Sequence, residues 1–330
     1  MQIIFTTLAI LLLSSFAFGQ TETIKGKVMF NGRLGQDTNH ILSKITYTAW
    51  SKQNGVYEIK NTIPGRYHTV VSANDTTSRK YSLFNPVPKD KMKDMETDRP
   101  DVTESAYTVE PGHFQVESDL FKHVRNRNNE MVNTGNVFNL GNYKLGLTER
   151  MDIQLVVPTY VSNGTRDLNT NKIINKTAGF DDLSLRFKYN IWGNAGGKTA
   201  LAALPFLSFP TSSFSRNGIQ GGIIFPFALK LQKGWDFGSQ VETDIVREED
   251  NCYHPDFACT FTFGKTISAK VSGFVEGLAT YSTYFKNAGI YANGGLIFSI
   301  SENFNIDAGF NYGINKDADK IYFTGFSFRL

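Results

Sequence analysis

The chain has 330 residues, enough for two or three domains, and its 34 basic and 31 acidic side chains nearly balance. This balance gives no sign of a nucleic-acid partner, and two cysteines are too few for a disulfide scaffold. Mean hydropathy is −0.26 and a long apolar run occurs only at the N-terminus, which excludes a helical membrane protein. The many Phe, Tyr and Gly residues suit strands joined by tight turns.

Residues 1–19 have the pattern of a signal peptide. An apolar stretch from Ile3 to Leu13 is followed by small residues, with Ala17 and Gly19 at the −3 and −1 positions of a cleavage site. The mature chain is therefore expected to begin at Gln20 and to be exported.

Residues 20–73 are predicted to form a small periplasmic β domain. The segments TIKGKVMF and ITYTAW alternate, and two further strands flank a turn at Pro64 and Gly65. The stretches 26–28, 54–59 and 63–67 resemble the carboxypeptidase-regulatory-like β-sandwich that precedes many outer-membrane proteins. Residues 74–110, which contain PVPKDKMKDMETDRPD, have the polar composition of a linker rather than a core.

Residues 111–330 read as a run of β-strands. Leu183, Leu185 and Phe187 alternate with Ser184, Arg186 and Lys188, so a period of two assigns each set to one face. A soluble sandwich would alternate in the same way, but most of these segments are long enough to cross a membrane at a tilt. The predicted strands span 113–123, 136–147, 151–161, 181–192, 198–210, 221–232, 235–246, 256–264, 267–283, 289–300, 304–314 and 321–330.

The gaps between these strands favour an outer-membrane barrel. Long gaps such as 162–180 alternate with short ones such as 233–234, as expected for external loops and periplasmic turns. The strands must close into a ring, because lipid cannot satisfy an open sheet edge. The chain finishes with YFTGFSFRL, in which Tyr322, Phe326, Phe328 and Leu330 share one face. This ending resembles the signal by which the barrel-assembly machinery receives outer-membrane proteins.

The segment ETDRPDVTESAYTVEPGHFQVESDL, residues 96–120, is the most specific stretch of the chain. It resembles the opening of the barrel in the outer-membrane transporter family named for the meta-pathway of phenol degradation. The stretches 179–194 and 199–213 resemble two further strands of that family. The resemblance covers about residues 96–330 and implies an outer-membrane barrel, without fixing a substrate.

The sequence predicts no catalytic, cofactor or metal site. GNAGGKT at 193–199 lacks the first glycine of a phosphate loop, because position 192 is Trp192. Cys252 and Cys259, with His254 and Asp256 nearby, could ligate a metal, but a local disulfide or two free thiols are the favoured interpretations. No Ser–His–acid set has a suggestive spacing.

The candidate functional residues are polar side chains predicted to face the barrel lumen. They line either an open polar channel or a salt-bridged, closed interior, and twelve strands allow both. Three residues of the TDRPD segment are hypothesised to plug the periplasmic mouth by pairing with these charges: Asp98, Arg99 and Asp101. The lumen candidates are Gln115, Glu117, Asp119, Asp152, Gln154, Asp182, Arg186, Lys188, Lys230, Gln240, Glu242, Asp244 and Asp307.

The sequence thus predicts an all-β protein: a closed antiparallel transmembrane barrel of about twelve strands behind a small β-sandwich-like domain. The expected function is a porin-like channel or transporter for small solutes in the bacterial outer membrane, with hydrophobic or aromatic solutes among the candidates. The alternatives are a non-transporting structural or adhesive barrel, acting chiefly through loop 162–179, and a membrane-embedded hydrolase. The expected partners are the lipid bilayer, lipopolysaccharide, the barrel-assembly machinery and a small-molecule solute, with no nucleic acid.

Overall fold

The computed structural model describes residues 50–51, 57–58, 81–127, 130–212, 218–248, 250–315 and 318–330. The chain divides into two units, Met1–Arg79 and Lys80–Leu330. In the first unit, β1 (Trp50–Ser51) and β2 (Tyr57–Glu58) pair in antiparallel fashion. The predicted signal peptide and the rest of the predicted β domain lie outside the described residues. Within the described parts of the chain, no helix is long and apolar enough to cross a membrane.

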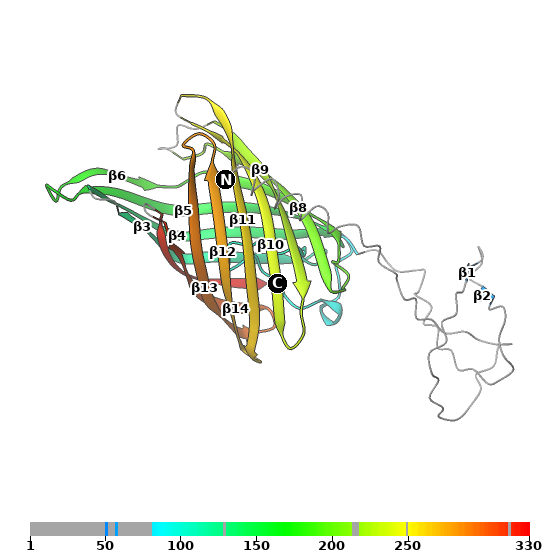
Figure 1. The fold of residues 1–330 in the computed structure, drawn as a ribbon. Helices are drawn as coiled ribbons and strands as arrows, with labels where there is room; N and C mark the ends of the chain where they lie inside the picture. Colours follow the sequence, from blue (N-terminus) through cyan, green and yellow to red (C-terminus); the bar gives the residue numbers. More distant parts are fainter. Residues whose placement is uncertain are drawn as a thin grey trace. The chain divides into compact units, whose positions relative to one another are not determined.

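The second unit is a closed antiparallel β-barrel of twelve strands (Figure 1). Neighbours in sequence pair with each other, and β15 pairs with β3 to close the ring. A thirteenth strand, β6 (Ile173–Gly179), adds to the outer part of β5. The ring contains β3 (Phe114–Arg127), β4 (Met131–Thr148), β5 (Met151–Asp167), β7 (Leu183–Trp192), β8 (Thr199–Phe209), β9 (Gln220–Lys230), β10 (Trp235–Arg247), β11 (Tyr253–Ser268), β12 (Val271–Ser282), β13 (Asn287–Ser301), β14 (Phe304–Gly313) and β15 (Lys320–Arg329).

The prediction of a closed twelve-stranded barrel is confirmed, and the alternation explains which face of each strand is buried. On β7, Leu185 and Tyr189 are 40 % exposed on the outside, whereas Lys188 is 1 % exposed on the inside. This is the reverse of a soluble protein, in which lysines face solvent and apolar residues the core. An apolar exterior around a polar interior is the pattern of a barrel surrounded by lipid.

The clearest differences from the predicted boundaries are at one turn and two long loops. The turn between β11 and β12 lies at 269–270 rather than 265–266. The expected long loops at 124–135 and 162–180 are largely strand, because β3–β4 and β5–β6 form hairpins that project beyond the ring (Figure 1). These extensions are polar on both faces, as in Asn163, Gly164 and Thr165, so they lack the apolar alternation by which strands were predicted.

An irregularity in β3 changes which of its side chains point into the barrel. Asp119 pairs with Gly325 and Phe121 with Thr324, so Leu120 is an extra residue, a β-bulge. Asp119 faces the interior, whereas Phe121 is 37 % exposed outside. Odd-numbered side chains of β3 therefore point inward before the bulge and outward after it.

A segment that precedes the barrel packs inside it. We name residues 93–110 the plug segment; it belongs to the stretch whose composition suggested a linker. It contains one of the most buried side chains of the unit, Ala106 at 1 % exposure, together with the buried residues Thr103, Thr108 and Val109. Its polar composition matches the polar interior that surrounds it. A short 3₁₀ turn, η2 (Lys89–Lys91), lies just before it.

Candidate functional site

The interior of the barrel is occupied by contacts between the plug segment and the wall. Hydrogen bonds reach the segment from strands on all sides of the ring, including β3, β7, β10, β12 and β14. Charged groups are buried in this interior, where they require partners to offset the loss of hydration.

The first cluster is built around Asp98. Its Oδ1 accepts a hydrogen bond from Lys188 Nζ at 2.7 Å, and its Oδ2 accepts one from Lys144 Nζ. Lys144 also contacts Glu117, which accepts the Asp98 backbone N–H at 2.9 Å. Two lysines thus balance two carboxylates. Burial alone would raise the pKa of Asp98, but Lys144 and Lys188 outweigh it and hold this pKa well below its usual range.

The second cluster is built around Arg99. Its Nη2 and Nε donate to the two carboxylate oxygens of Asp307 at 2.6 and 3.2 Å, and its Nη1 contacts Asp119. Lys122 supplies a second cation to Asp119 at 2.6 Å. The guanidinium carbon lies 5.8 Å from the centroid of the Phe323 ring. Planar Arg groups suit such bidentate, stacked geometry better than Lys does.

Glu276 holds the backbone of the plug segment directly. Its carboxylate accepts the Thr103 N–H at 2.8 Å, the Val102 N–H at 3.1 Å and the Thr103 hydroxyl at 2.6 Å. Asn293 donates a further bond at 2.6 Å. Asp101 lies beside this carboxylate, and burial together with the charge of Glu276 raises the pKa of Asp101 well above its usual range.

Glu104 links the plug segment to β7 and β10. Its Oε1 accepts a hydrogen bond from Arg186 at 2.6 Å, and its backbone N–H donates to Gln240 Oε1 at 2.7 Å. Burial, followed by the negative charge of Asp98, raises the pKa of Glu104 to about 7. Glu104 is therefore a carboxyl group that titrates near neutral pH.

The last part of the plug segment is held by amides. Asn190 donates to the Ala106 carbonyl at 2.7 Å, and Asn194 accepts the Thr108 N–H at 3.0 Å. The Val109 N–H donates to Asp152 at 3.0 Å. Main-chain groups of the segment thus find their partners on wall side chains, which satisfies the requirement that buried backbone groups be paired.

A collar of Val87, Glu110, His113, Gly146 and Leu330 at one end of the barrel joins the plug segment to both ends of the ring. The His113 N–H donates to the Glu110 carbonyl at 3.0 Å, and the Gly146 N–H donates to the His113 carbonyl at 3.0 Å. The two ring nitrogens of His113 lie 2.7 Å from the carbonyl oxygens of Leu330 and Val87. The Leu330 N–H donates to Phe114 at 2.9 Å. A cavity of about 350 Å³ opens beside this collar and is lined by Lys93, Glu96, Tyr107, Lys230, Arg329 and neighbours.

Most of the predicted site residues lie where the alternation placed them. Asp98 and Arg99 contact wall residues of opposite charge, whereas Asp101 lies beside the like-charged Glu276. Lys230 shares the inner face of β9 with the buried Ile224, but it lies at the collar end of the strand, where its side chain is 54 % exposed and lies 3.6 Å from Glu96 of the plug segment. The fully buried wall candidates are Gln115, Glu117, Asp119, Asp152, Gln154, Lys188, Gln240 and Asp307, and the half-buried ones are Asp182, Arg186, Glu242 and Asp244.

Several residues of the site were not predicted. Lys144 is among the most buried side chains, and its position between Tyr143 and Leu145 in an alternating strand was a usable signal. Glu276 lies in β12, where glycines on one face obscured the alternation. Asn194 occupies a turn, where no periodicity applies.

The cysteine-containing loop has no metal-binding geometry. Cys252 and Cys259 are both free thiols. His254 instead contacts Glu248 and Asp256, each at 3.0 Å. The described residues contain no group of three or more His, Cys, Asp or Glu side chains arranged to hold a metal ion.

One solved structure shows the same fold, and others are more distantly similar. An outer-membrane channel from Pseudomonas putida F1 matches with a TM-score of 0.54 and 10 % identity, covering 71 % of this chain and all of that one. The transport unit of the autotransporter AIDA-I from Escherichia coli matches with a TM-score of 0.44 and 10 % identity, covering 71 % and 92 %. The KdgM porin matches at 0.41 and 9 %, covering 65 % and 98 %. No curated protein sequence matches the chain.

The closed ring, the apolar exterior and the filled polar interior define an outer-membrane β-barrel with an internal plug. A family model described as "Putative MetA-pathway of phenol degradation" matches residues 97–330. The chain belongs to this family. The match begins at Thr97 and so includes residues 97–110 of the plug segment.

Proposed function

We propose that this protein is an outer-membrane channel for small solutes and that the plug segment is its gate, seen here closed. One observation carries this proposal: the buried charges of the wall pair with the plug segment. Asp119 and Asp307 share Arg99, and Lys144 and Lys188 share Asp98. A barrel built to remain closed could pair these wall charges directly and would need no inserted segment.

The course of the plug segment favours reversible release. Lys93, where it enters, lies 3.3 Å from Glu110, where it leaves, so both ends are at one mouth of the barrel. Such a loop can leave the lumen without being threaded through it. We assign this mouth to the periplasm, because β3 begins and β15 finishes there and the exported chain arrives from that side.

The interior suggests solutes that are small and weakly charged. Cations and carboxylates are mixed, which argues against strong ion selectivity. Aromatic rings share the inner face, with Arg186 over Phe206 and Arg99 over Phe323. We propose that hydrophobic or aromatic solutes are among those transported, in keeping with the description of the family.

The remaining parts of the proposal rest on sequence. We propose that residues 1–19 are a signal peptide, that residues 20–73 form a periplasmic β domain of the carboxypeptidase-regulatory-like kind, and that residues 74–92 connect it to the plug segment. Delivery by the barrel-assembly machinery is expected from the last strand. The protein is not expected to be an enzyme, since the polar side chains of the lumen engage the plug segment.

A disulfide between the plug segment and the wall tests the gate. Thr103 Oγ1 and Thr260 Oγ1 are 2.6 Å apart and buried, so Thr103→Cys with Thr260→Cys brings two thiols together. The pair is made in a background with Cys252→Ser and Cys259→Ala. Purified protein is inserted into planar bilayers and liposomes, and conductance and swelling are measured with and without reductant.

The oxidised pair should close the channel, and reductant should restore it to the level of the background protein. The single Thr103→Cys variant controls for loss of the hydroxyl and should not respond to reductant. Equal conductance of oxidised and reduced forms would show that the segment is not a gate. No conductance and no swelling in any form would favour the structural or adhesive barrel.

A further inference from the structure

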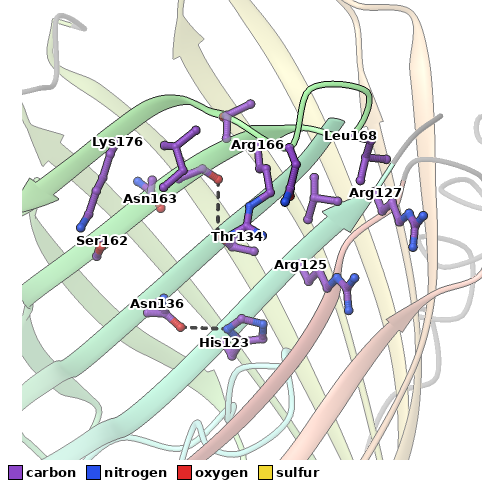
Figure 2. Close-up of a pocket in the computed structure, with 15 residues that line it drawn as sticks. His123, Arg125, Arg127, Thr134, Asn136, Ser162, Asn163, Arg166, Leu168 and Lys176 are labelled. Atoms are coloured by element: carbon purple, nitrogen blue, oxygen red, sulfur yellow. Dashed lines mark hydrogen bonds between the residues drawn. The ribbon is translucent and has the colours of Figure 1, made fainter. Parts of the chain in front are cut away.

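A cavity of about 580 Å³ lies on the outer face of the barrel wall, where β3, β4, β5 and β6 project beyond the ring (Figure 2). It is distant in the fold from the collar and faces away from the lumen. Its lining includes Arg125, Arg127, Arg166 and Lys176 together with His123, and it contains no Asp or Glu. Within the described part of the chain, none of these four cations has an ion-pair partner.

The side chains face outward because of the bulge in β3. Beyond Leu120, His123 pairs with Tyr322, which is 52 % exposed on the lipid side of β15, and Arg125 pairs with Lys320. Directly opposed residues of paired strands point to the same face. His123 and Arg125 therefore share the outer face with Tyr322, and the cavity is open to whatever surrounds the barrel.

The outer face is graded from apolar to cationic along the strands. A row of aromatic residues comes first, with ring centroids 5.1 Å apart for Phe121 and Phe138 and 6.1 Å for Phe138 and Tyr160. The next row lies two residues further along each strand, is polar, and contains His123, Asn136 and Ser162. Aromatic side chains in such a row mark the boundary between hydrocarbon and headgroups.

Two cationic rows follow, and in each row smaller side chains lie between the two cations. Arg127, Val132 and Arg166 are in register on three neighbouring strands, so the two guanidinium groups flank Val132. Two strand spacings separate these arginines by roughly 10 Å, which leaves room for one anionic group between them. In the other row Arg125 and Lys176 flank Thr134 and Gly164.

We propose that this surface binds the phosphorylated headgroup of a lipid in the outer leaflet, the diphosphorylated glycolipid lipid A of lipopolysaccharide. The acyl chains lie against the aromatic row, the sugars against His123, Asn136 and Ser162, and the phosphates between the cations. Arginine binds phosphate through paired N–H donors, and basic side chains near an anionic membrane surface bind it electrostatically. The inference rests on the proposed orientation, in which this end is extracellular.

Binding is measured on the folded protein in detergent by native mass spectrometry, with three probes: diphosphoryl lipid A, lipid A without phosphates, and inorganic phosphate. The triple variant Arg125→Gln, Arg127→Gln, Arg166→Gln should bind diphosphoryl lipid A about a hundredfold more weakly. A matched triple variant at the other end of the barrel, Lys233→Gln, Lys265→Gln, Lys270→Gln, should change affinity by no more than about twofold.

A single substitution provides a second test that does not depend on the folding of the triple variant. Val132→Glu places a carboxylate between Arg127 and Arg166, on an exposed face. This carboxylate should pair with the two arginines in place of a lipid phosphate and so weaken lipid A binding. Val132→Gln is the neutral control and should retain binding. Equal lipid A affinity for wild type and Val132→Glu would overturn the proposal. Wild-type protein that bound the phosphate-free lipid as tightly as diphosphoryl lipid A would also overturn it. Inorganic phosphate that bound as tightly as lipid A would overturn it too, because it would indicate a site for soluble anions. None of these outcomes depends on whether the barrel conducts.

Discussion

The guanidinium of Arg99 contacts both carboxylate oxygens of Asp307, a residue of β14 far along the chain. The same guanidinium contacts Asp119 on β3, so one plug side chain bridges two wall strands separated in the ring by β15. Its removal leaves two buried carboxylates facing each other. The pairing therefore ties the plug segment to the place where the ring closes.

Arg99→Ala should open the channel. Removing one partner of a buried ion pair typically costs about 3–5 kcal/mol, and here the cost falls on the docked state of the plug segment. Single-channel recordings should show higher conductance or a higher open probability than wild type. Arg99→Lys should be intermediate, because one ammonium cannot bridge Asp119 and Asp307 in the same geometry. Wild-type currents in Arg99→Ala would contradict the gating role.

Glu276→Ala should loosen the plug segment around Val102 and Thr103. Their backbone N–H groups lose the carboxylate that accepts them, at about 1–3 kcal/mol for each unsatisfied donor. Hydrogen exchange followed by mass spectrometry should show faster exchange of a peptide covering these residues. Glu302→Gln, in an exposed turn, serves as the control and should leave the exchange unchanged. Protection equal to wild type in Glu276→Ala would show that the segment is held from elsewhere.

Opening should depend on pH through Glu104. Its pKa is about 7 in the docked segment against 4.5 for the free group, so docking takes up a proton. The stabilisation is fully present below about pH 4.5, declines as pH rises and is lost above about pH 7. Asp98, whose pKa is lowered, stays charged across this window. Conductance should therefore increase from acidic to slightly alkaline pH.

Glu104→Gln should flatten this pH profile between about pH 5 and 8, because the titrating group is absent. The charged groups that act on Glu104 include Asp98, Lys144, Arg186, Lys188 and the wall carboxylate Glu242. Glu242→Gln is therefore measured in parallel. A profile that persists in Glu104→Gln and disappears in Glu242→Gln would assign the titration to the wall instead.

Gly146→Ala should weaken the collar. A Cβ at this position would lie 2.0 Å from the Glu110 carbonyl oxygen and 2.7 Å from that of Val109, both backbone atoms that cannot rotate away. The plug segment should become more accessible to protease. The rate of cleavage is measured by gel electrophoresis of samples taken over time. Gly277→Ala has open space around the added carbon and should resist cleavage as wild type does. Equal resistance of both variants would mean that the collar adjusts to the extra carbon.

The barrel could be predicted from the sequence because lipid imposes a strict pattern on it. Residues such as Leu185 and Tyr189 must alternate with Lys188, and this period of two located all twelve strands. The polar extensions around Asn163 carry no such constraint, since they lie beyond the aromatic row that marks the hydrocarbon boundary. Their strand structure depends on pairing across the hairpin, which alternation does not reveal.

The sequence predicts which polar side chains face the interior, but it does not predict which of them pair with each other. The facing of Glu117, Asp119 and Asp307 follows from alternation, whereas the partner of each depends on register and on the path of a segment without regular structure. The predicted linker contains Asp98 and Arg99 in a stretch of other charges, and composition cannot distinguish a solvated charge from a buried one. The reversal at Leu120 is likewise a property of strand pairing.

Many of the bonds that hold the plug segment end on its main chain, among them those of the N–H groups of Val102, Thr103, Glu104 and Val109 and of the carbonyl of Ala106. Main-chain groups are present whatever the residue. The wall thus recognises the path of the segment as well as its charged side chains. Positions whose bonds to the wall end only on the main chain, such as Val102, can therefore change without removing those bonds. The route of the segment through the barrel interior is in this respect separable from the side chains that it presents there.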